Sequence, residues 1–330
     1  MIGRRELITL LGGAAAAWPM AARAQRPALP TIGFLSGATF EIMRGYVGAF
    51  HRGLADAGLY EGRSVAIEYR WAEGHNDRLP ALATDLVHRK ANVIVVGGST
   101  PGALAAKAAT ETIPIVFLVG TDPVALGLVA SLNRPGGNIT GITILNVELI
   151  AKCLELAHSL TPPSSTIAVL INPANIPQAA TERAIVQDAA RVLGARVAFL
   201  TASIPSEIDS AFATLVSEQV AALVVSGETF FFTQRDRLVE LAASHAVPTV
   251  YAQREFVMGG GLASYGADIS DAYLHHVSVS TSRILKGEKP ADLPVQQVTK
   301  VELVLNLKTA KALGLAFPLT LLARADEVIE

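Results

Sequence analysis

The sequence has little charge, few aromatic residues and almost no cysteine. Of its 330 residues, 17% are charged, 6% are aromatic, and Cys153 is the single cysteine. A single cysteine excludes an intramolecular disulfide, so the fold has to be stabilised by buried apolar cores. The formal net charge of −2 is spread without a basic stripe. Nucleic acid is therefore not an expected partner, because binding its backbone needs clustered Lys and Arg.

Long apolar runs are missing beyond the N-terminal segment, and this predicts a soluble, monomeric mature chain. The N-terminal segment begins with Arg4 and Arg5, continues with an apolar stretch over Leu7–Met20, and ends in small residues around Ala24. This order is typical of a cleavable signal peptide, here residues 1–24, and predicts a periplasmic protein. The paired arginines favour twin-arginine export over Sec export.

Two stretches of the chain instead contain short apolar strands that alternate with helical patterns in the same order. The first is predicted to run through strand Thr31–Ser36, helix Tyr46–Ala57, strand Val65–Tyr69, helix Leu79–Arg89, strand Val93–Val96, helix Pro101–Thr110 and strand Ile115–Val119. The second runs through strand Thr166–Ile171, helix Ala180–Leu193, strand Val197–Leu200, helix Ile208–Ser217, strand Ala222–Val225, helix Gln234–His245 and strand Thr249–Tyr251. Helices between strands force parallel pairing, so each stretch predicts a doubly wound sheet.

The expected fold class is therefore α/β, with two doubly wound parallel-sheet lobes joined by a multi-strand hinge. A chain of this length also exceeds what one core usually holds. The segments are assigned as 29–143 plus 255–295 for lobe 1, and 144–254 plus 296–330 for lobe 2. The hinge is expected at the segments that join the sheets, near Ile142–Leu145, Tyr251–Arg254 and Val295–Val298.

No catalytic or metal-binding signature occurs in the sequence. It contains no GxxxxGK[ST], GxSxG, HExxH or CxxC pattern, so we expect neither an enzyme nor a bound cofactor or metal. Cys153 lies in a helical pattern without an adjacent His or basic partner, which favours a core residue. The loop GGSTPG at Gly97–Gly102 resembles a dinucleotide loop but lacks the GxGxxG spacing, so an exported Rossmann-like enzyme is a weaker alternative.

Ligands of open parallel sheets bind at the carboxyl ends of the strands, and this indicates where a site should lie. The loops that qualify are Ser36–Phe40, Gly97–Thr100, Gly120–Pro123, Asn172–Asn175, Ser226–Phe231 and Gln253–Phe256. The candidate ligand-binding residues are Ser36, Phe40, Ser99, Thr100, Thr121, Asp122, Asn172, Glu228, Phe230, Tyr251, Glu255 and Tyr265.

Three chemical roles can be assigned within this set. Ser99 and Thr100 precede a helix start, where hydroxyl and backbone N–H groups suit a ligand carboxylate, although either hydroxyl serves equally well as an N-cap. Asp122 is the first candidate for a ligand ammonium and Glu228 the second, and each is equally compatible with a solvated loop acid or a cap. Aromatic contacts to a ligand tail are expected from Phe40, Phe230 and Tyr251.

Four stretches carry a family resemblance. They are AFHRGLADAGLYEGRSVAIEYRWAEGHNDRLPALATDLV at Ala49–Val87, IPIVFLVGTDPVALGLVASLNRPGGNITGIT at Ile113–Thr143, GGLASYG at Gly260–Gly266, and ADLPVQQVTKVELVLNLKTAKALGL followed by LLARADEVIE at the end. With these, the chain resembles the ABC transporter substrate-binding proteins that have the type 1 periplasmic binding fold. The resemblance implies three crossovers between lobes, capture of a ligand by closure, and delivery to an ABC permease in the inner membrane.

The resemblance also narrows the class of ligand. Similar proteins include binders of aromatic amino acids, which implies a small organic ligand that is amino-acid-like or an aromatic carboxylate. A ligand-sensing binding protein that docks on a membrane receptor is the alternative, because its binding physics would be the same and only its partner would differ.

Overall fold

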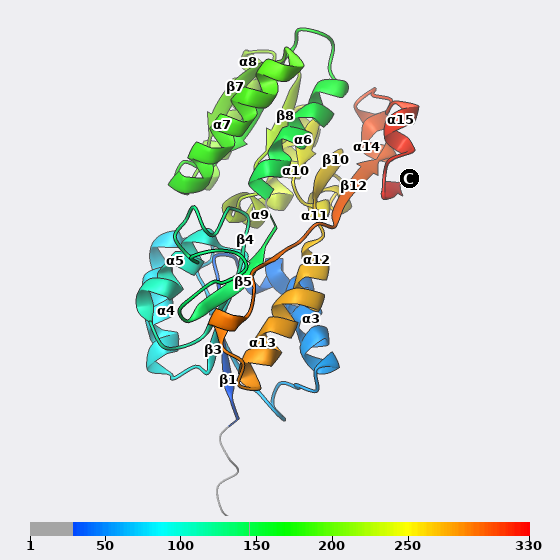
Figure 1. The fold of residues 1–330 in the computed structure, drawn as a ribbon. Coiled ribbons are helices and arrows are strands. Elements are labelled where there is room, and N and C mark those ends of the chain that lie inside the picture. Colours follow the sequence, from blue (N-terminus) through cyan, green and yellow to red (C-terminus); the bar gives the residue numbers. More distant parts are fainter. Residues whose placement is uncertain (1–28, 145) are drawn as a thin grey trace, which may run out of the picture.

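The computed structural model describes residues 29–144 and 146–330, so the expected signal peptide lies outside the described residues. These residues form two α/β lobes stacked end to end (Figure 1). Each lobe is built around one largely parallel sheet with helices on both faces. The predicted order of strands and helices in both repeats is confirmed, as is the fold class of two parallel-sheet lobes.

The sheet of the first lobe has the strand order β11-β5-β4-β3-β1-β2, with every pair parallel. Its strands are β1 (Thr31–Ser36), β2 (Ala66–Trp71), β3 (Val93–Gly97), β4 (Ile115–Val119), β5 (Ile139–Thr143) and β11 (Gln296–Gln297). Its helical elements are α3 (Phe40–Asp56), η1 (Asn76–Arg78), α4 (Leu79–His88), α5 (Thr100–Ala109), α12 (Ile269–Ala272), the π-helical turn η2 (Tyr273–Val277), α13 (Ser278–Leu285) and η3 (Pro290–Asp292). Helices α4 and α5 pack together on one face, and α3 packs with α12 and α13 on the other (Figure 1).

The sheet of the second lobe has the order β13-β12-β10-β9-β8-β6-β7 and is parallel except between β10 and β12. Its strands are β6 (Thr166–Ile171), β7 (Arg196–Thr201), β8 (Ala222–Val225), β9 (Thr249–Tyr251), β10 (Ala263–Ala267), β12 (Val301–Asn306) and β13 (Glu327–Ile329). Its helices are α6 (Asn146–Ser159), α7 (Ile176–Leu193), α8 (Pro205–Ser217), α9 (Thr229–Thr233), α10 (Arg235–Ser244), α11 (Arg254–Met258), α14 (Leu307–Ala312) and α15 (Leu319–Leu322).

The central strand β6 shows why the sheet of the second lobe is covered on both faces. Its side chains alternate between two apolar clusters, because successive residues of a strand point to opposite faces. Ile167 and Val169 join the cluster that contains α6 and α7, whereas Ala168 and Leu170 join the cluster that contains α8 and α10. The sequence of β6 is therefore continuously apolar because both faces of this strand are buried.

Cys153 is part of this core. It lies on α6, is 1% exposed, and its Sγ donates to the carbonyl oxygen of Tyr265 at 3.3 Å. Burial raises the pKa of the Cys153 thiol to about 12, so the thiol is protonated near neutral pH. Its expected role as a core residue agrees with this position.

Three segments cross between the lobes, and two of the expected boundaries need correction. Strand β10 pairs with β9 in the second sheet, so the crossing expected near Tyr251–Arg254 lies instead at Asp268, between β10 and α12. Strand β11 pairs with β5 in the first sheet, so the third crossing follows β11 and does not precede it. The glycine-rich stretch that leads into β10 contains no strong strand pattern, and for this reason β10 was not predicted as a strand.

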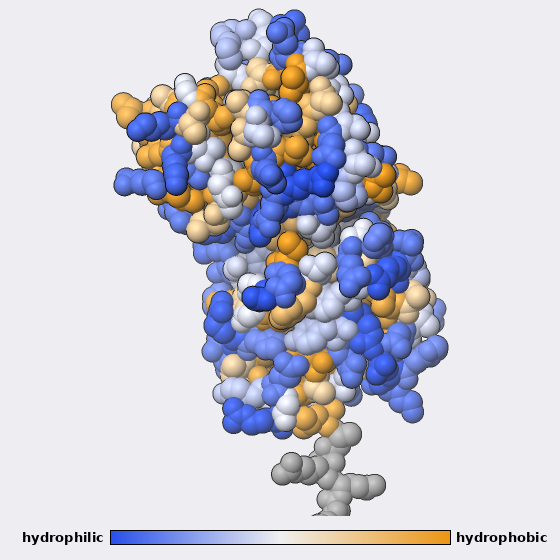
Figure 2. All heavy atoms as spheres, turned by 180° about the vertical axis from the view of Figure 1, so that it is seen from behind, coloured by the Kyte–Doolittle hydropathy of each residue, from blue (hydrophilic) through white to orange (hydrophobic). Residues whose placement is uncertain are grey.

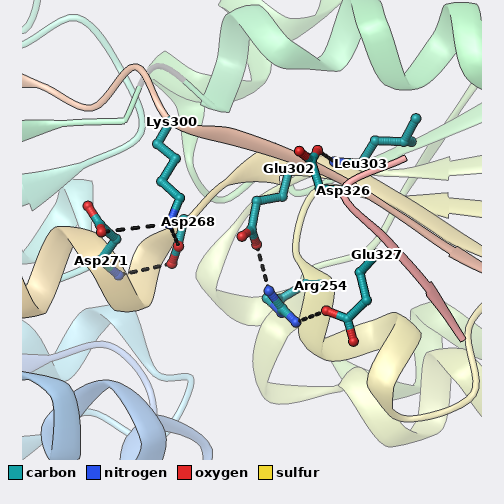
Figure 3. Close-up of polar contacts among 8 residues, drawn as sticks. All are labelled: Arg254, Asp268, Asp271, Lys300, Glu302, Leu303, Asp326 and Glu327. Carbon is teal, nitrogen blue, oxygen red and sulfur yellow. Dashed lines mark hydrogen bonds and ion pairs between the residues drawn. The ribbon is translucent and has the colours of Figure 1, made fainter. Parts of the chain in front are cut away.

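The second and third crossings lie side by side because β10 and β12 are antiparallel neighbours (Figure 3). Lys300 Nζ pairs with the Asp268 carboxylate at 2.7 Å and lies 3.7 Å from Asp271. Asp268 also caps α12 by accepting from the Asp271 N–H at 2.9 Å. Burial opposes ionisation of Asp268, but its hydrogen bond with Lys300 holds the pKa of this carboxyl below its usual value.

A second ionic group fixes the second-lobe side of the same crossings. Arg254 of α11 pairs with Glu302 of β12 at 2.8 Å and with Glu327 of β13 (Figure 3). These contacts tie β12 and the edge strand β13 to α11, which is the next element after β9. The lobes are thus connected through a braced pair of strands in addition to the segment between β5 and α6.

The surface of the second lobe is apolar in places. Figure 2, seen from behind, shows hydrophobic side chains gathered on the side of the second lobe that carries α14 and α15. Leu319 of α15 is 84% exposed. Over residues 29–144 and 146–330, no helix has the length and apolar content needed to cross a membrane.

Candidate functional site

A cavity lies between the lobes, where the carboxyl ends of strands from both sheets meet. Its volume is about 50 Å³, which is room for no more than a few water molecules. Its lining comes from both lobes and from the first crossing segment: Met43, Tyr46, Gly97, Gly98, Thr100, Leu118, Gly120, Ile144, Asn175, Gln178, Gly227, Thr229, Phe232, Gln253, Ile269 and Tyr273. We call this the inner cavity.

Aromatic rings form one wall of the inner cavity. The rings of Tyr46 and Tyr273 are stacked with centroids 5.6 Å apart at 13°, and the ring of Phe232 also stacks with that of Tyr46, at 5.6 Å and 19°. Tyr46 comes from α3 and Tyr273 from the π-helical turn η2, both in the first lobe, whereas Phe232 belongs to α9 of the second. The stack therefore spans the boundary between the lobes. Turns of the π type occur frequently at functional sites.

Unsatisfied polar atoms gather at the same place. Within the described residues, the buried side-chain polar atoms without a hydrogen-bond partner belong to Tyr46, Asn175, Tyr251, Gln253 and Tyr273. All of these residues except Tyr251 line the inner cavity. A buried polar atom without a partner costs roughly 1–3 kcal/mol, and folded proteins contain few of them. Their concentration here indicates a place where a ligand supplies the missing partners.

Tyr46 has a buried carboxyl group, that of Glu255, as a neighbour on the opposite lobe. Burial raises the pKa of the Tyr46 hydroxyl well above its usual value, and the negative charge of Glu255 on α11 raises it further. Burial likewise raises the pKa of Glu255. Both groups are therefore held toward their protonated forms, which makes the Tyr46 hydroxyl a hydrogen-bond donor at any physiological pH.

Two buried carboxyl groups lie behind the second-lobe wall. Glu182 of α7 accepts from Gln178 Nε2 at 2.9 Å and from Ser226 Oγ at 2.6 Å. Burial raises the pKa of Glu182 to about 7, against the effect of these two hydrogen bonds, and the charge of Glu228 adds to the rise. Glu228 accepts from Asn172 Nδ2 at 2.9 Å, and burial raises its pKa as well.

The start of α5 brings the first lobe into contact with the second. Ser99 Oγ accepts from the Gly102 N–H at 3.0 Å, so of the two roles open to Ser99 the structure shows the N-cap. Thr100 lines the inner cavity, and its hydroxyl lies 3.2 Å from that of Thr121. Thr229 Oγ1 of the second lobe donates to the carbonyl oxygen of Gly98 at 2.8 Å. This bond joins the two lobes directly across the cavity.

A larger second cavity adjoins the inner one at Gly120. Its volume is about 460 Å³, and its lining again comes from both lobes: Gly120, Thr121, Asp122, Ala125, Leu126, Val147, Glu148, Pro177, Thr181 and Ile185. We call it the outer cavity. Asp122 and Glu148 are exposed at its rim, and Asp122 Oδ1 caps the Val124 N–H at 2.8 Å. The outer cavity is thus an apolar space with an acidic rim.

The structure brings together only part of the predicted set of site residues. Thr100 lines the inner cavity, and Thr121 and Asp122 line the outer one. Ser36, Ser99, Asn172, Glu228 and Glu255 lie behind these walls, in contact with lining residues or with each other. The remaining four residues, which are Phe40, Phe230, Tyr251 and Tyr265, lie elsewhere.

These four aromatic residues do not line either cavity between the lobes. Phe230 is 6% exposed and Tyr251 is fully buried, and both belong to the apolar core. Phe40 is 43% exposed and contacts Trp71 edge-on. Tyr265 faces a separate depression between α6 and the C-terminal elements of the second lobe. The aromatic rings that line the inner cavity are instead those of Tyr46, Phe232 and Tyr273.

The residues missed by sequence reasoning lie mainly on helices. Every expected loop except Ser36–Phe40 contributes a lining residue, so the location by loops agrees with the structure. Tyr46, Gln178 and Tyr273, however, come from helical turns that face the cleft. No motif marks them, and a polar or aromatic residue on a helix is ordinarily assigned to a solvated face or to the core.

Comparison with known proteins agrees with this architecture. The family model described as ABC transporter substrate binding protein matches residues 35–329. A tyrosine-binding protein of Clostridioides difficile (strain R20291) is 29% identical over 266 residues, which is 81% of this chain and 75% of that protein. A Streptococcus pneumonia ABC domain in complex with L-Trp is 28% identical, with a TM-score of 0.82 over 92% of this chain and 100% of the other. A conserved domain protein of Vibrio cholerae is 27% identical, with a TM-score of 0.83 over 90% of this chain and 99% of that chain.

The chain belongs to the ABC transporter substrate binding protein family, because that family's model matches most of its length. It is a substrate-binding protein of the ABC type with the type 1 periplasmic binding fold. The family consists of binding proteins and not of enzymes, in agreement with the prediction from the sequence.

Proposed function

We propose that this protein captures an aromatic amino acid, or a closely similar aromatic carboxylate, between its lobes and delivers it to an ABC permease. The observation that carries the proposal is the inner cavity, in which stacked aromatic rings and unsatisfied side-chain oxygens from both lobes lie together. A tyrosine-binding relative and a relative solved with L-Trp support this class of ligand. The proposal includes export to the periplasm as a monomer after removal of residues 1–24.

The proposed pose differs from the one expected from sequence in the aromatic residues, which are now Tyr46, Phe232 and Tyr273, and in the partner of the ammonium. The ligand carboxylate lies at the start of α5, near Gly98 and Thr100, where backbone N–H groups and the helix dipole favour an anion. The ammonium lies at the side-chain oxygens of Asn175 and Gln253, which are buried and unpaired. Asp122 is replaced in this role because its carboxylate is exposed at the rim, where it caps Val124.

Capture requires the lobes to move. The inner cavity has room for no more than a few water molecules, and the Thr229–Gly98 hydrogen bond joins the lobes across it. We therefore propose that the structure is a closed form and that the lobes rotate apart at the three crossings to admit a ligand. The lobes then close around it and remove its ring and its charged groups from water.

The proposal is tested with the mature chain beginning at Gln25. Thermal unfolding is measured with L-tryptophan, L-tyrosine and L-phenylalanine, and with L-leucine and D-glucose as ligands of other classes. At 100 times its Kd, a ligand stabilises the native state by about 2.7 kcal/mol, which is a rise in Tm of about 5 °C for a chain of this size. We expect such a rise with at least one aromatic amino acid. A rise with glucose or leucine and none with the aromatic set would contradict the proposal.

A further inference from the structure

Three side chains on one face of α7 form a hydrogen-bonded chain that ends in the inner cavity. Asn175, Gln178 and Glu182 are spaced three and four residues apart, which places them on the same side of a helix. Asn175 Nδ2 donates to Gln178 Oε1 at 3.0 Å, and Gln178 Nε2 donates to Glu182 Oε1 at 2.9 Å. All three side chains are buried, with no more than 5% exposed.

The carboxylate at the far end gives this chain a direction. An ionised carboxylate can only accept hydrogen bonds, whereas each amide has one accepting and one donating end. Glu182 therefore attracts the NH2 group of Gln178 and leaves Gln178 Oε1 facing Asn175. Gln178 Oε1 in turn attracts the NH2 group of Asn175, so that Asn175 Oδ1 is left facing the cavity. The orientation of Gln178 follows from Glu182, and that of Asn175 follows from Gln178 together with Glu228, whose carboxyl is also hydrogen-bonded to the Asn175 side chain.

The position of Asn175 provides a second and independent observation. Asn175 is the N-cap residue of α7, where an Asn side chain usually accepts from a backbone N–H of the first turn. It makes no such bond, and its Oδ1 is buried without a partner. Gln253 Oε1, from the loop after β9, is a second buried and unpaired acceptor that lines the same cavity.

We infer that Glu182 is a positioning residue that makes the site selective for a protonated amine, by fixing Asn175 Oδ1 toward the ligand through Gln178. This inference rests on the proposed function, because it concerns the same inner cavity. Asn175 Oδ1 and Gln253 Oε1 together offer two acceptors to the N–H groups of an ammonium. A ligand that lacks the amine leaves both acceptors unpaired.

The environment of Glu182 makes this selectivity dependent on pH. Burial raises its pKa to about 7, and the nearby charge of Glu228 acts in the same direction. Its other neighbours are Ser226, which donates to it, and Cys153 of α6, whose thiol is protonated near neutral pH. Once protonated, Glu182 can donate to Gln178, and the direction of the chain is no longer enforced. Affinity for an amine-bearing ligand should therefore fall as the pH is lowered from 8 to 6.

Calorimetric titration with matched pairs of probes tests the inference. The pairs are L-tryptophan with 3-(indol-3-yl)propionate and L-tyrosine with 3-(4-hydroxyphenyl)propionate, in which the second member lacks only the amine. The parent protein is expected to prefer the amino acid by at least tenfold at pH 8. In Glu182→Gln, whose amide can turn either way, we expect this preference to fall by about tenfold and its dependence on pH to disappear. Affinity for the propionates should change by less than threefold.

A second substitution separates positioning from loss of structure. Asn175→Asp presents only acceptor oxygens whatever the state of Gln178, so adding it to Glu182→Gln is expected to restore the preference for the amine. Glu240→Gln, an exposed residue on α10 of the same lobe, is the control and should match the parent.

The outcomes distinguish the two proposals. If the parent binds none of these four probes and no L-phenylalanine, the proposed function and this inference both fail. If the parent binds the propionates as well as the amino acids, the inference is refuted while the proposed function stands. If the parent prefers the amino acid and Glu182→Gln retains that preference and its pH profile, the positioning role is refuted while the proposed function stands. If the double variant fails to regain the preference, the effect of Glu182 does not run through Asn175 and the inference is refuted.

Discussion

At the scale of a residue, Glu182 links the chemistry of the inner cavity to the stability of the second lobe. In the unfolded chain its carboxyl loses its proton near pH 4.5, whereas in the folded protein burial keeps it protonated up to about pH 7. Between these values the folded state binds more protons than the unfolded state. Its contribution to the free energy of unfolding therefore falls as the pH rises through this window and is lowest above pH 7. The site tolerates this cost because the ionised carboxylate orients the amides.

Glu182→Gln should remove this dependence on pH. The difference between a pKa of 4.5 and one of 7 corresponds to about 3 kcal/mol, so the variant is expected to be more stable than the parent at pH 8 and nearly equal to it at pH 5. Urea unfolding at both values measures this, with Glu240→Gln as the control. Parallel stability curves for parent and variant over this range would show that Glu182 is ionised in the folded state throughout.

At the scale of an element, the site depends on how closely α3 packs against the helix that returns from the second lobe. Helix α3 carries Tyr46, and the returning segment carries Tyr273. Gly53 lies at their contact, where a Cβ atom would come within 2.2 Å of the Leu274 carbonyl oxygen and of Ser278 Oγ. The absence of a side chain at Gly53 lets the two helices approach closely enough for the two tyrosine rings to stack.

Gly53→Ala should therefore destabilise the protein by about 1–3 kcal/mol, because the backbone carbonyl of Leu274 has to move. Gly45→Ala on the same helix is the matched control, since a Cβ atom there meets no heavy atom within 4 Å. Its higher helix propensity should leave the stability unchanged or raise it by up to about 1 kcal/mol. Denaturant unfolding measures both. Equal effects of the two substitutions would show that the helices separate freely.

Some helices and strands could be predicted from the sequence and others could not. Most strands of the two repeats are apolar runs between clear turn residues, so the order of the four strands in each repeat and their carboxyl-end loops could be predicted. The short strands β10 and β11 each join the sheet of the lobe to which the sequence did not assign them. No local pattern encodes which sheet a strand joins. Gln178 and Glu182 have the spacing of a solvated helix face, and tertiary contacts bury them, among them the hydrogen bond that Ser226 donates to Glu182. Tertiary contacts of this kind leave no signal in the helix itself.

At the scale of the whole molecule, contacts that join the lobes lie at the inner cavity and at the crossings. The Thr229–Gly98 hydrogen bond and the stack of Phe232 on Tyr46 join the lobes at the inner cavity. The crossings themselves are braced by Lys300 with Asp268 and by Arg254 with two glutamates. The contacts that change on opening are therefore concentrated at the ligand, and this couples closure to binding.

Thr229→Val should weaken ligand binding without affecting the fold. Loss of one hydrogen bond of the closed form costs about 0.5–1.5 kcal/mol, which is an affinity about two- to tenfold weaker. Thr233→Val is the control, because the hydrogen bonds described for the Thr233 hydroxyl stay within the second lobe: it donates to the Phe230 carbonyl oxygen at 2.6 Å and accepts from Gln234 Nε2 at 3.4 Å. Calorimetry gives the affinities, and small-angle scattering with and without L-tryptophan gives the compaction. An affinity unchanged in Thr229→Val would mean that this contact is also present in the open form.

The single thiol gives the molecule an internal reporter on one lobe. Cys153 of α6 is buried against β10 and is protonated at neutral pH. An alkylating reagent can therefore reach it only when the second lobe unfolds locally. The rate of labelling then follows the local unfolding of that lobe, whatever happens in the other. A rotation at the crossings that keeps each lobe folded leaves the thiol buried and unlabelled, whereas unfolding of the second lobe exposes it to the reagent. Hinge motion and partial unfolding, which look alike in most measurements of size, can thus be told apart in this protein without adding any label site.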